Sequence, residues 1–137
     1  MAVYLNNGVV VTFGAANKDI SDWVSSITLN RNWDELEVTA MGDTGHKYVA
    51  GLEAGSITID FFNDFASDAS MALIDAAAGT VVAMTVKPTA AAVSATNPLY
   101  SFNVLVNGIT PINGSVTDLA TSSVTWNISG AITKTTA

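Results

Sequence analysis

Apolar and polar residues alternate with a period of two in several segments of the chain, a pattern typical of half-buried β-strands. The clearest alternation covers residues 35–41 and 56–62, where every second residue is apolar. Less regular alternation predicts further strands over residues 8–13, 23–33, 80–87, 100–106 and 122–133. These segments together predict a mainly β chain.

One segment has a helical pattern instead. Its signals are the apolar face of Met71, Ile74 and Ala78, the capping residue Ser67, the acid Asp68 beside the positive helix end, and Gly79 as a left-handed stop. We predict a helix over about residues 67–78 that packs on a sheet. Strands on both sides of a single helix predict a β-sandwich or a partly open barrel with one short flanking α-helix.

The two clearest strands are separated by residues 42–55, which contain four glycines and much of the local charge. This composition predicts a long loop, with Tyr48 and Leu52 as its apolar contacts. Loops of this length without secondary structure are uncommon in compact domains and are often functional.

Composition narrows the class of protein. A length of 137 residues with 49% apolar residues suits a single domain over residues 1–137, for which we expect flexible termini. The chain has no cysteine and one histidine, which excludes a disulfide framework, a thiol nucleophile and a His/Cys metal cage. Residues 1–7 lack the regions of a signal peptide and no apolar run is long enough for a membrane span, so we expect synthesis in the cytoplasm and no membrane partner.

Charge is distributed unevenly. Residues 1–75 carry 11 acids and 3 bases, a net charge of −8, whereas residues 76–137 carry 1 acid and 2 bases, a net charge of +1. Nucleic-acid binding draws its affinity from lysine and arginine, and only five such residues are present. A surface that grips DNA is therefore disfavoured, whereas a surface that repels DNA is compatible with the charge.

Candidate catalytic and metal-binding residues have simpler interpretations. Glu35 and Glu37, next to Asp34, point to the same strand face without a partner that would separate their pKa values, so they are interpreted as solvated acids. The oxygen ligands Asp60, Asn63, Asp64 and Asp68 lack the glycine-bearing spacing of an EF-hand. We expect no metal and no cofactor.

Two further features of the sequence could suggest an enzyme. His46 has no serine or cysteine nucleophile motif to serve, and the triplet Asp43-Thr44-Gly45 lacks the hydrophobic strand flanks of an aspartic protease. The chain is predicted not to be an enzyme. Three tryptophans could form a stacking platform, but they are predicted to point inward and are interpreted as core residues: Trp23, Trp33 and Trp126.

Several stretches resemble the major tail tube proteins of long-tailed, siphovirus-type bacteriophages, of the actinobacterial-phage type. They are ELEVTAMGDT at 35–44, YVAGL at 48–52, SITIDFF at 56–62, VKPT at 86–89 with SATNP at 94–98, and GSV at 114–116 with SVTW at 123–126. These matches occur in the family's order and span most of the chain from Ser26 onward. None of them is a catalytic signature.

This resemblance implies a structural virion protein that closes into hexameric rings, which stack as the tail tube through which DNA is ejected. Its partners would be further copies of itself and the tape-measure, tail tip and terminator proteins, with DNA passing without specific binding. Its location would be the virion tail, after assembly in the host cytoplasm.

The resemblance also implies roles for particular residues. The loop at 42–55 would bridge neighbouring subunits or rings through Asp43, His46, Lys47, Tyr48, Leu52 and Glu53. An acidic lumen would be lined by Glu35, Glu37 and Asp60. The alternatives are a capsid decoration or other virion surface protein and, from another class, a carbohydrate-binding β-sandwich module, which exposed aromatic residues would favour.

Overall fold

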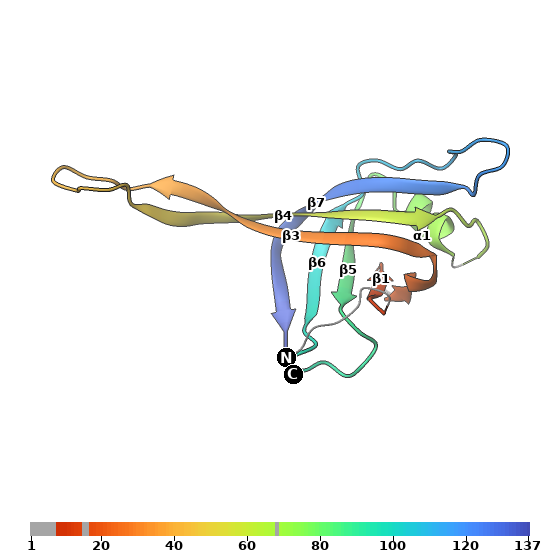
Figure 1. Ribbon diagram of the computed structural model, residues 1–137. Coiled ribbons are helices and arrows are strands. Elements are labelled where there is room, and N and C mark those ends of the chain that lie inside the picture. Colours follow the sequence, from red (N-terminus) through yellow and green to blue (C-terminus); the bar gives the residue numbers. More distant parts are fainter. Residues whose placement is uncertain (1–7, 15–16, 68) are drawn as a thin grey trace.

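The residues that the structure describes form one antiparallel sheet of seven strands and a single α-helix. The computed structural model describes residues 8–14, 17–67 and 69–137. The strands follow the order β2-β1-β5-β6-β7-β4-β3, so β2 and β3 are edges and the sheet does not close into a barrel (Figure 1). Their bounds are β1 Val10–Phe13, β2 Lys18–Asp19, β3 Val24–Glu37, β4 Tyr48–Phe62, β5 Val81–Lys87, β6 Leu99–Leu105 and β7 Thr121–Thr135. The predicted mainly β fold is confirmed.

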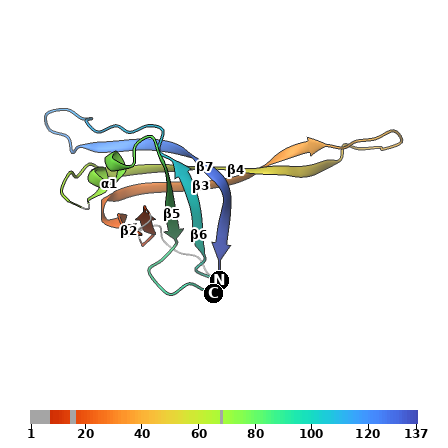
Figure 2. The same cartoon turned by 180° about the vertical axis from the view of Figure 1, so that it is seen from behind.

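Strand β7 folds this sheet into two layers. Its first half pairs with β4 over Thr121–Asn127, and its second half, from Ile128, pairs with β6. Within the second half the register with β6 shifts between Ser129 and Thr133, and in this interval Gly130 has a φ of 95°, a conformation that glycine adopts without strain. Figures 1 and 2 show β7 turning there, so that β5 and β6 run across β3 and β4. A strand that switches layers through such a bend forms the corner of an orthogonal packing.

The core lies between the two layers. Every second residue of β7 before the corner points inward, and Trp126 is fully buried with its indole Nε1 donating to the Gly108 carbonyl at 2.9 Å. Phe13 packs against it, with ring centroids 6.0 Å apart. The alternation in the sequence therefore predicted the inward face of β7 correctly.

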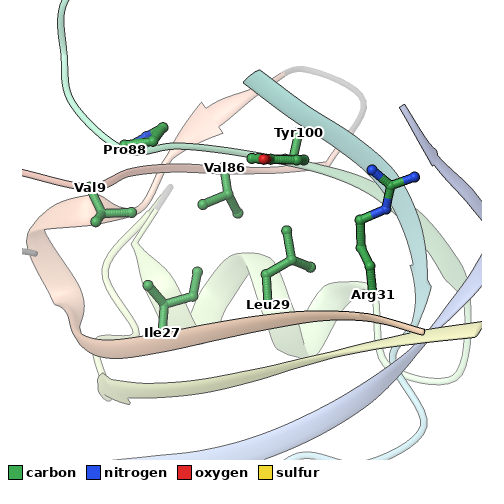
Figure 3. A pocket seen from close by; sticks show the side chains of 7 residues that line it. All are labelled: Val9, Ile27, Leu29, Arg31, Val86, Pro88 and Tyr100. Carbon is green, nitrogen blue, oxygen red and sulfur yellow. The ribbon is translucent and has the colours of Figure 1, made fainter. Parts of the chain in front are cut away.

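The open side of the sheet, between β3 and the β1–β5 pair, holds a cavity of about 380 Å³. Ile27 and Leu29 point from β3 toward Val86 and Tyr100 across it (Figure 3). Arg31 stands at one end of the same row on β3. This partial opening distinguishes the fold from a closed barrel.

The helix α1, Ser70–Ala76, is shorter than predicted. Ser67 does not cap it, because the backbone carbonyl of Asp64 accepts the Met71 and Ala72 N–H groups instead. The Ser70 hydroxyl donates to the Phe62 carbonyl at 2.6 Å and anchors the first turn to β4. The predicted role of Asp68 lies outside the described residues.

The C-terminal end of the helical region agrees with the sequence. Gly79 has a φ of 79°, as a left-handed stop requires, and its N–H donates to the Val106 carbonyl at 2.6 Å. The expectation of flexible termini concerns, at the N-terminal end, residues 1–7, which lie outside the described residues. The other predicted strands agree with β1, β5, β6 and β7 to within two residues at each end.

The predicted loop at 42–55 is wrong over most of its length. Strand β4 already begins at Tyr48, and β3 runs without interruption from Val24 to Glu37 instead of forming two strands. The connection therefore comprises residues 38–47 only. Gly51 and Gly55 suggested a loop, but both positions lie where the ladder needs a residue without a side chain.

Three elements had no sequence prediction. The short strand β2 and the 3-10 helix η1, Ser21–Trp23, precede β3. A long connection over residues 106–120 joins β6 to β7.

Candidate assembly interface

The β3–β4 hairpin extends well beyond the body of the molecule. We call its distal part, residues 31–55, the arm. Figures 1 and 2 show the arm projecting on the side opposite α1. Its strands remain paired almost to the tip, with Leu36 opposite Val49 and Glu37 opposite Tyr48. Because both strands continue from the body, the arm is an extension of the core sheet and not a separate loop.

A bulge interrupts the pairing midway along the arm. The register shifts between Trp33 and Glu35, and β4 contributes one residue more than β3 at this point. A Cβ atom at Gly51 would lie 2.9 Å from Cβ of Asp34 and 3.3 Å from Cδ1 of Leu36. Glycine is therefore required for close approach of the two strands beside the bulge.

The surface of the arm is unusually apolar. Among the described residues, 14 large hydrophobic side chains are exposed, and half of them lie on the arm. These seven are Trp33, Leu36, Val38, Met41, Tyr48, Val49 and Leu52. Leu52 is 81% exposed and Met41 is completely exposed. Exposed apolar groups concentrated in one place are characteristic of interaction surfaces.

Hydrogen bonds order the tip of the arm. The Val38 N–H donates to the Lys47 carbonyl at 2.8 Å, and the Lys47 N–H donates to the Thr39 hydroxyl oxygen at 2.9 Å. The carboxylate of Glu37 accepts from the Thr39 hydroxyl at 2.9 Å and lies 2.5 Å from Nδ1 of His46. The tip therefore has a defined shape before any partner binds.

A second group of contacts closes the turn. One carboxylate oxygen of Asp43 accepts from the Ala40 N–H at 2.7 Å, and the other lies 2.9 Å from Nζ of Lys47. The Ala40 N–H, and secondarily Lys47, holds the pKa of Asp43 below its usual range. Asp43 and Lys47 are thus engaged with each other within the tip.

An ionic cluster fastens the root of the arm to the body. Nε of Arg31 donates to Oε1 of Glu53 at 2.9 Å, and its guanidinium also donates to the Ile132 carbonyl at 3.4 Å. The Ile132 N–H donates to the same oxygen of Glu53 at 3.3 Å. Arg31 holds the pKa of Glu53 below its usual range. Both backbone polar groups of Ile132, just after the corner of β7, thus interact with side chains of the arm.

Two structures of gene transfer agent particles share this architecture. One is described as the virion of a native gene transfer agent particle: the TM-score is 0.74 at 14% sequence identity, over 97% of this chain and 99% of the other. The second is the tail of an empty particle with C6 symmetry: the TM-score is 0.73 at 14% identity, over 98% and 100%. This chain shares their fold. No protein-family profile and no curated protein sequence matches it.

The six residues predicted for subunit contacts all lie on the arm but differ in accessibility. Tyr48 and Leu52 belong to β4 and are exposed. Asp43, His46 and Lys47 lie in the tip, where each has a partner within the chain. Glu53 is engaged at the root with a side chain only 14% exposed. Their role in assembly remains a prediction.

The three acids predicted for a lumen do not lie together. Glu35 and Glu37 share one face of β3, as their spacing implied. Asp60 pairs with Ser26 on the opposite face of the sheet, whereas Ile59 and Phe61 beside it point into the core. Within the subunit, Asp60 therefore lies on the opposite face from Glu35 and Glu37, and their role in a lumen remains a prediction.

Sequence reasoning missed part of the site. Trp33 is 50% exposed, so its assignment to the core is wrong; its ring lies 5.0 Å from the guanidinium carbon of Arg31. Trp126 is buried as predicted, and Trp23 packs at the edge of the core. The alternation of apolar and polar residues does not show where a strand extends beyond the body of the molecule, because one face of the strand stays apolar even where it is exposed. The sequence signal that could have indicated an exposed arm is a pattern of apolar residues flanked by acidic residues.

The described residues contain no group of three or more histidine, cysteine or acidic side chains that could hold a metal. The carboxylate of Asp64 accepts from Nε1 of Trp23 at 3.0 Å and from the Ala66 N–H at 2.9 Å. The Asn63 amide donates to the Pro111 carbonyl, and its oxygen accepts from Ser122.

In the part of the chain that the structure describes, no helix has the length and apolar character needed to cross a membrane.

Proposed function

We propose that this chain is a structural subunit of a phage-like tail, which assembles into hexameric rings stacked as a tube for DNA ejection. The observation that carries the proposal is the shared fold over nearly the whole chain with a C6-symmetric tail and with a virion particle. Both similar structures are of particles and not of enzymes. The expected location is the virion tail, after assembly in the host cytoplasm.

The arm supports self-assembly on independent physical grounds. It carries seven exposed large apolar side chains on an ordered scaffold. Removing apolar surface from water stabilises association by roughly 25 cal/mol per Å². Because ordering of the tip has already occurred within the subunit, docking costs less conformational entropy. We assign the arm to contacts with a neighbouring subunit or ring.

The free edge of β3 gives a second reason for assembly. It is a strand of 14 residues at the edge of the sheet. A long edge strand presents unpaired backbone groups that favour pairing with another chain. A symmetric ring gives these groups a defined partner and excludes uncontrolled aggregation. The remaining expected partners are the tape-measure, tail tip and terminator proteins.

Electron microscopy and sedimentation of the purified chain at rising concentration test this proposal. Rings with six-fold symmetry and stacked tubes are expected. A strict monomer, even with other tail proteins present, would contradict self-assembly, whereas binding to capsids without rings would favour a decoration protein. Polysaccharide binding through exposed Trp33 would favour a carbohydrate-binding module.

The arm is tested by substituting its apolar side chains. Leu52→Asp should prevent assembly while leaving the monomer folded, because the side chain is 81% exposed. Leu119→Asp is the matched control: Leu119 is 74% exposed on the 106–120 connection, away from the arm, and this variant should assemble. Normal tubes of the Leu52→Asp variant would overturn the assignment of the arm.

A further inference from the structure

Nine residues on β3, β4 and β7 form a regular array on the outward face of the sheet, which we call the polar grid. Its three rows across the strands are Ser26–Asp60–Ser123, Thr28–Thr58–Thr125 and Asn30–Ser56–Asn127. The rows are in direct lateral register, and the hydroxyl groups of Thr58 and Thr125 are hydrogen-bonded at 3.0 Å. Neighbouring residues on these strands point into the core, so the grid is the uncovered side of this layer.

The chemistry of the grid is uniform. It contains six hydroxyl side chains, two amides and one carboxylate, that of Asp60. None of the 14 exposed large hydrophobic side chains lies on it. Subunit interfaces are centred on apolar and aromatic residues, which the grid lacks. The grid is therefore poorly suited to docking another protein.

The chain's five lysine and arginine residues all lie elsewhere. Arg31 is on the opposite face of β3, and Lys47 is in the tip of the arm. The remaining three are Lys18 on β2, Lys87 on β5 and Lys134 on β7 beyond the corner. Because phosphate contacts of lysine and arginine supply the affinity for DNA, a face without them does not retain a duplex.

Resting on the tube function proposed above, we infer that the polar grid is the face that lines the channel and meets the passing DNA. The outward face of the other layer carries exposed Val81 and Leu105 together with Lys87, so it lacks the uniformly polar, cation-free character of the grid. Hydroxyl and amide groups, with one partly buried carboxylate per subunit, offer a polyanion weak repulsion and no cation that would hold it. Glu35 and Glu37, on the opposite face of β3, do not line the channel in this arrangement.

Single-cysteine labelling of assembled tubes tests this inference, because the chain has no other thiol. Ser123→Cys places a nearly isosteric thiol on the grid, and Thr125→Cys provides a second grid position if the first variant folds poorly. Asn103→Cys on the outward face of β6 is the control. Each variant is treated with a small maleimide and with a maleimide on a polymer too large for the channel, before and after tube dissociation.

In intact tubes, Cys at 123 or 125 should react with the small reagent but not with the polymer, whereas Cys at 103 should react with both. Polymer labelling of the grid position at the rate of the free subunit would place the grid outside and overturn the inference. Protection from both reagents would make it a subunit contact, which also overturns it. Failure of the unmodified chain to form tubes would instead overturn the proposed function, and the inference with it.

A gain of DNA binding gives an independent readout. The double variant Thr28→Lys/Thr125→Lys introduces two cations per subunit on the grid. Its tubes should retain duplex DNA at low salt and release it as salt is raised, whereas wild-type tubes should not retain DNA. If tubes of this variant do not retain DNA at low salt, the inference that the grid faces the channel is wrong.

Discussion

Substituting Gly55 by alanine tests whether the root of the arm is packed as tightly as its contacts imply. A Cβ atom at Gly55 would lie 2.9 Å from the Asn30 carbonyl oxygen, 3.0 Å from Cδ1 of Ile128 and 3.2 Å from Cδ1 of Ile132. The closest contact is to the backbone of the paired strand β3, which cannot rotate away as a side chain could. The substitution must therefore displace β3, β7 or both.

The expected free-energy change follows from two opposing effects. Overpacking a close contact costs about 1–3 kcal/mol. Replacing glycine in a strand by alanine recovers about 0.5–1 kcal/mol of conformational entropy. From the middle of each range, the net destabilisation of Gly55→Ala is about 1 kcal/mol. For a chain of this length, that corresponds to a fall in Tm of roughly 2–5 °C.

Urea and thermal unfolding, followed by circular dichroism, measure this effect. Gly45→Ala is the matched control, because nothing lies within 4 Å of its added Cβ. The control should be unchanged or stabilised by up to about 1 kcal/mol. If Gly55→Ala is as stable as the control, the close packing of β7 against the arm root is incorrect.

Three further substitutions have expected outcomes. Trp126→Ala should lower the free energy of unfolding by about 3–5 kcal/mol, because the indole is fully buried; a loss under 1 kcal/mol in urea unfolding would be inconsistent with that burial. Gly130→Ala should cost about 1–2 kcal/mol, since its φ is 95°, and wild-type stability would show that the corner tolerates another conformation. The folded-state pKa of Glu53 lies below its ordinary value of 4.5, so ionised Glu53 stabilises the fold above that pH, and this contribution disappears as the pH falls through the lowered pKa. Glu53→Gln should therefore flatten the loss of stability below pH 4.5, and an unchanged acid unfolding curve would contradict the role of the Arg31–Glu53 pair.

The strands could be predicted because burial on one face imposes a period of two, as in β7 with buried Val124 and Trp126. The arm could not be predicted. Its residues alternate like those of a buried strand, so Trp33 suggested a core, and the length of the hairpin depends on pairing between residues far apart in sequence. Gly51 suggested a loop because its packing against Asp34 is visible only in three dimensions.

The location of the candidate site could largely be predicted from the sequence, but the arrangement of its side chains could not. Residues 42–55 do contain much of the arm, including exposed Tyr48 and Leu52. The engagement of Glu53 by Arg31 and Ile132 required the corner of β7, which no local pattern signals. Likewise, the separation of Asp60 from Glu35 follows from the register of two strands, and composition carries no information about register.

The continuity of β3 and β4 from the body into the arm has a mechanical consequence. Hydrogen bonds in an antiparallel pair lie perpendicular to the strands. A pull along the arm is carried by both of its strands and loads the β4–β7 ladder in shear, so that many of its bonds resist together. A loop without paired strands in the same place would bend under this load. The paired arm is stiffer, because its two strands continue into the sheet of the body.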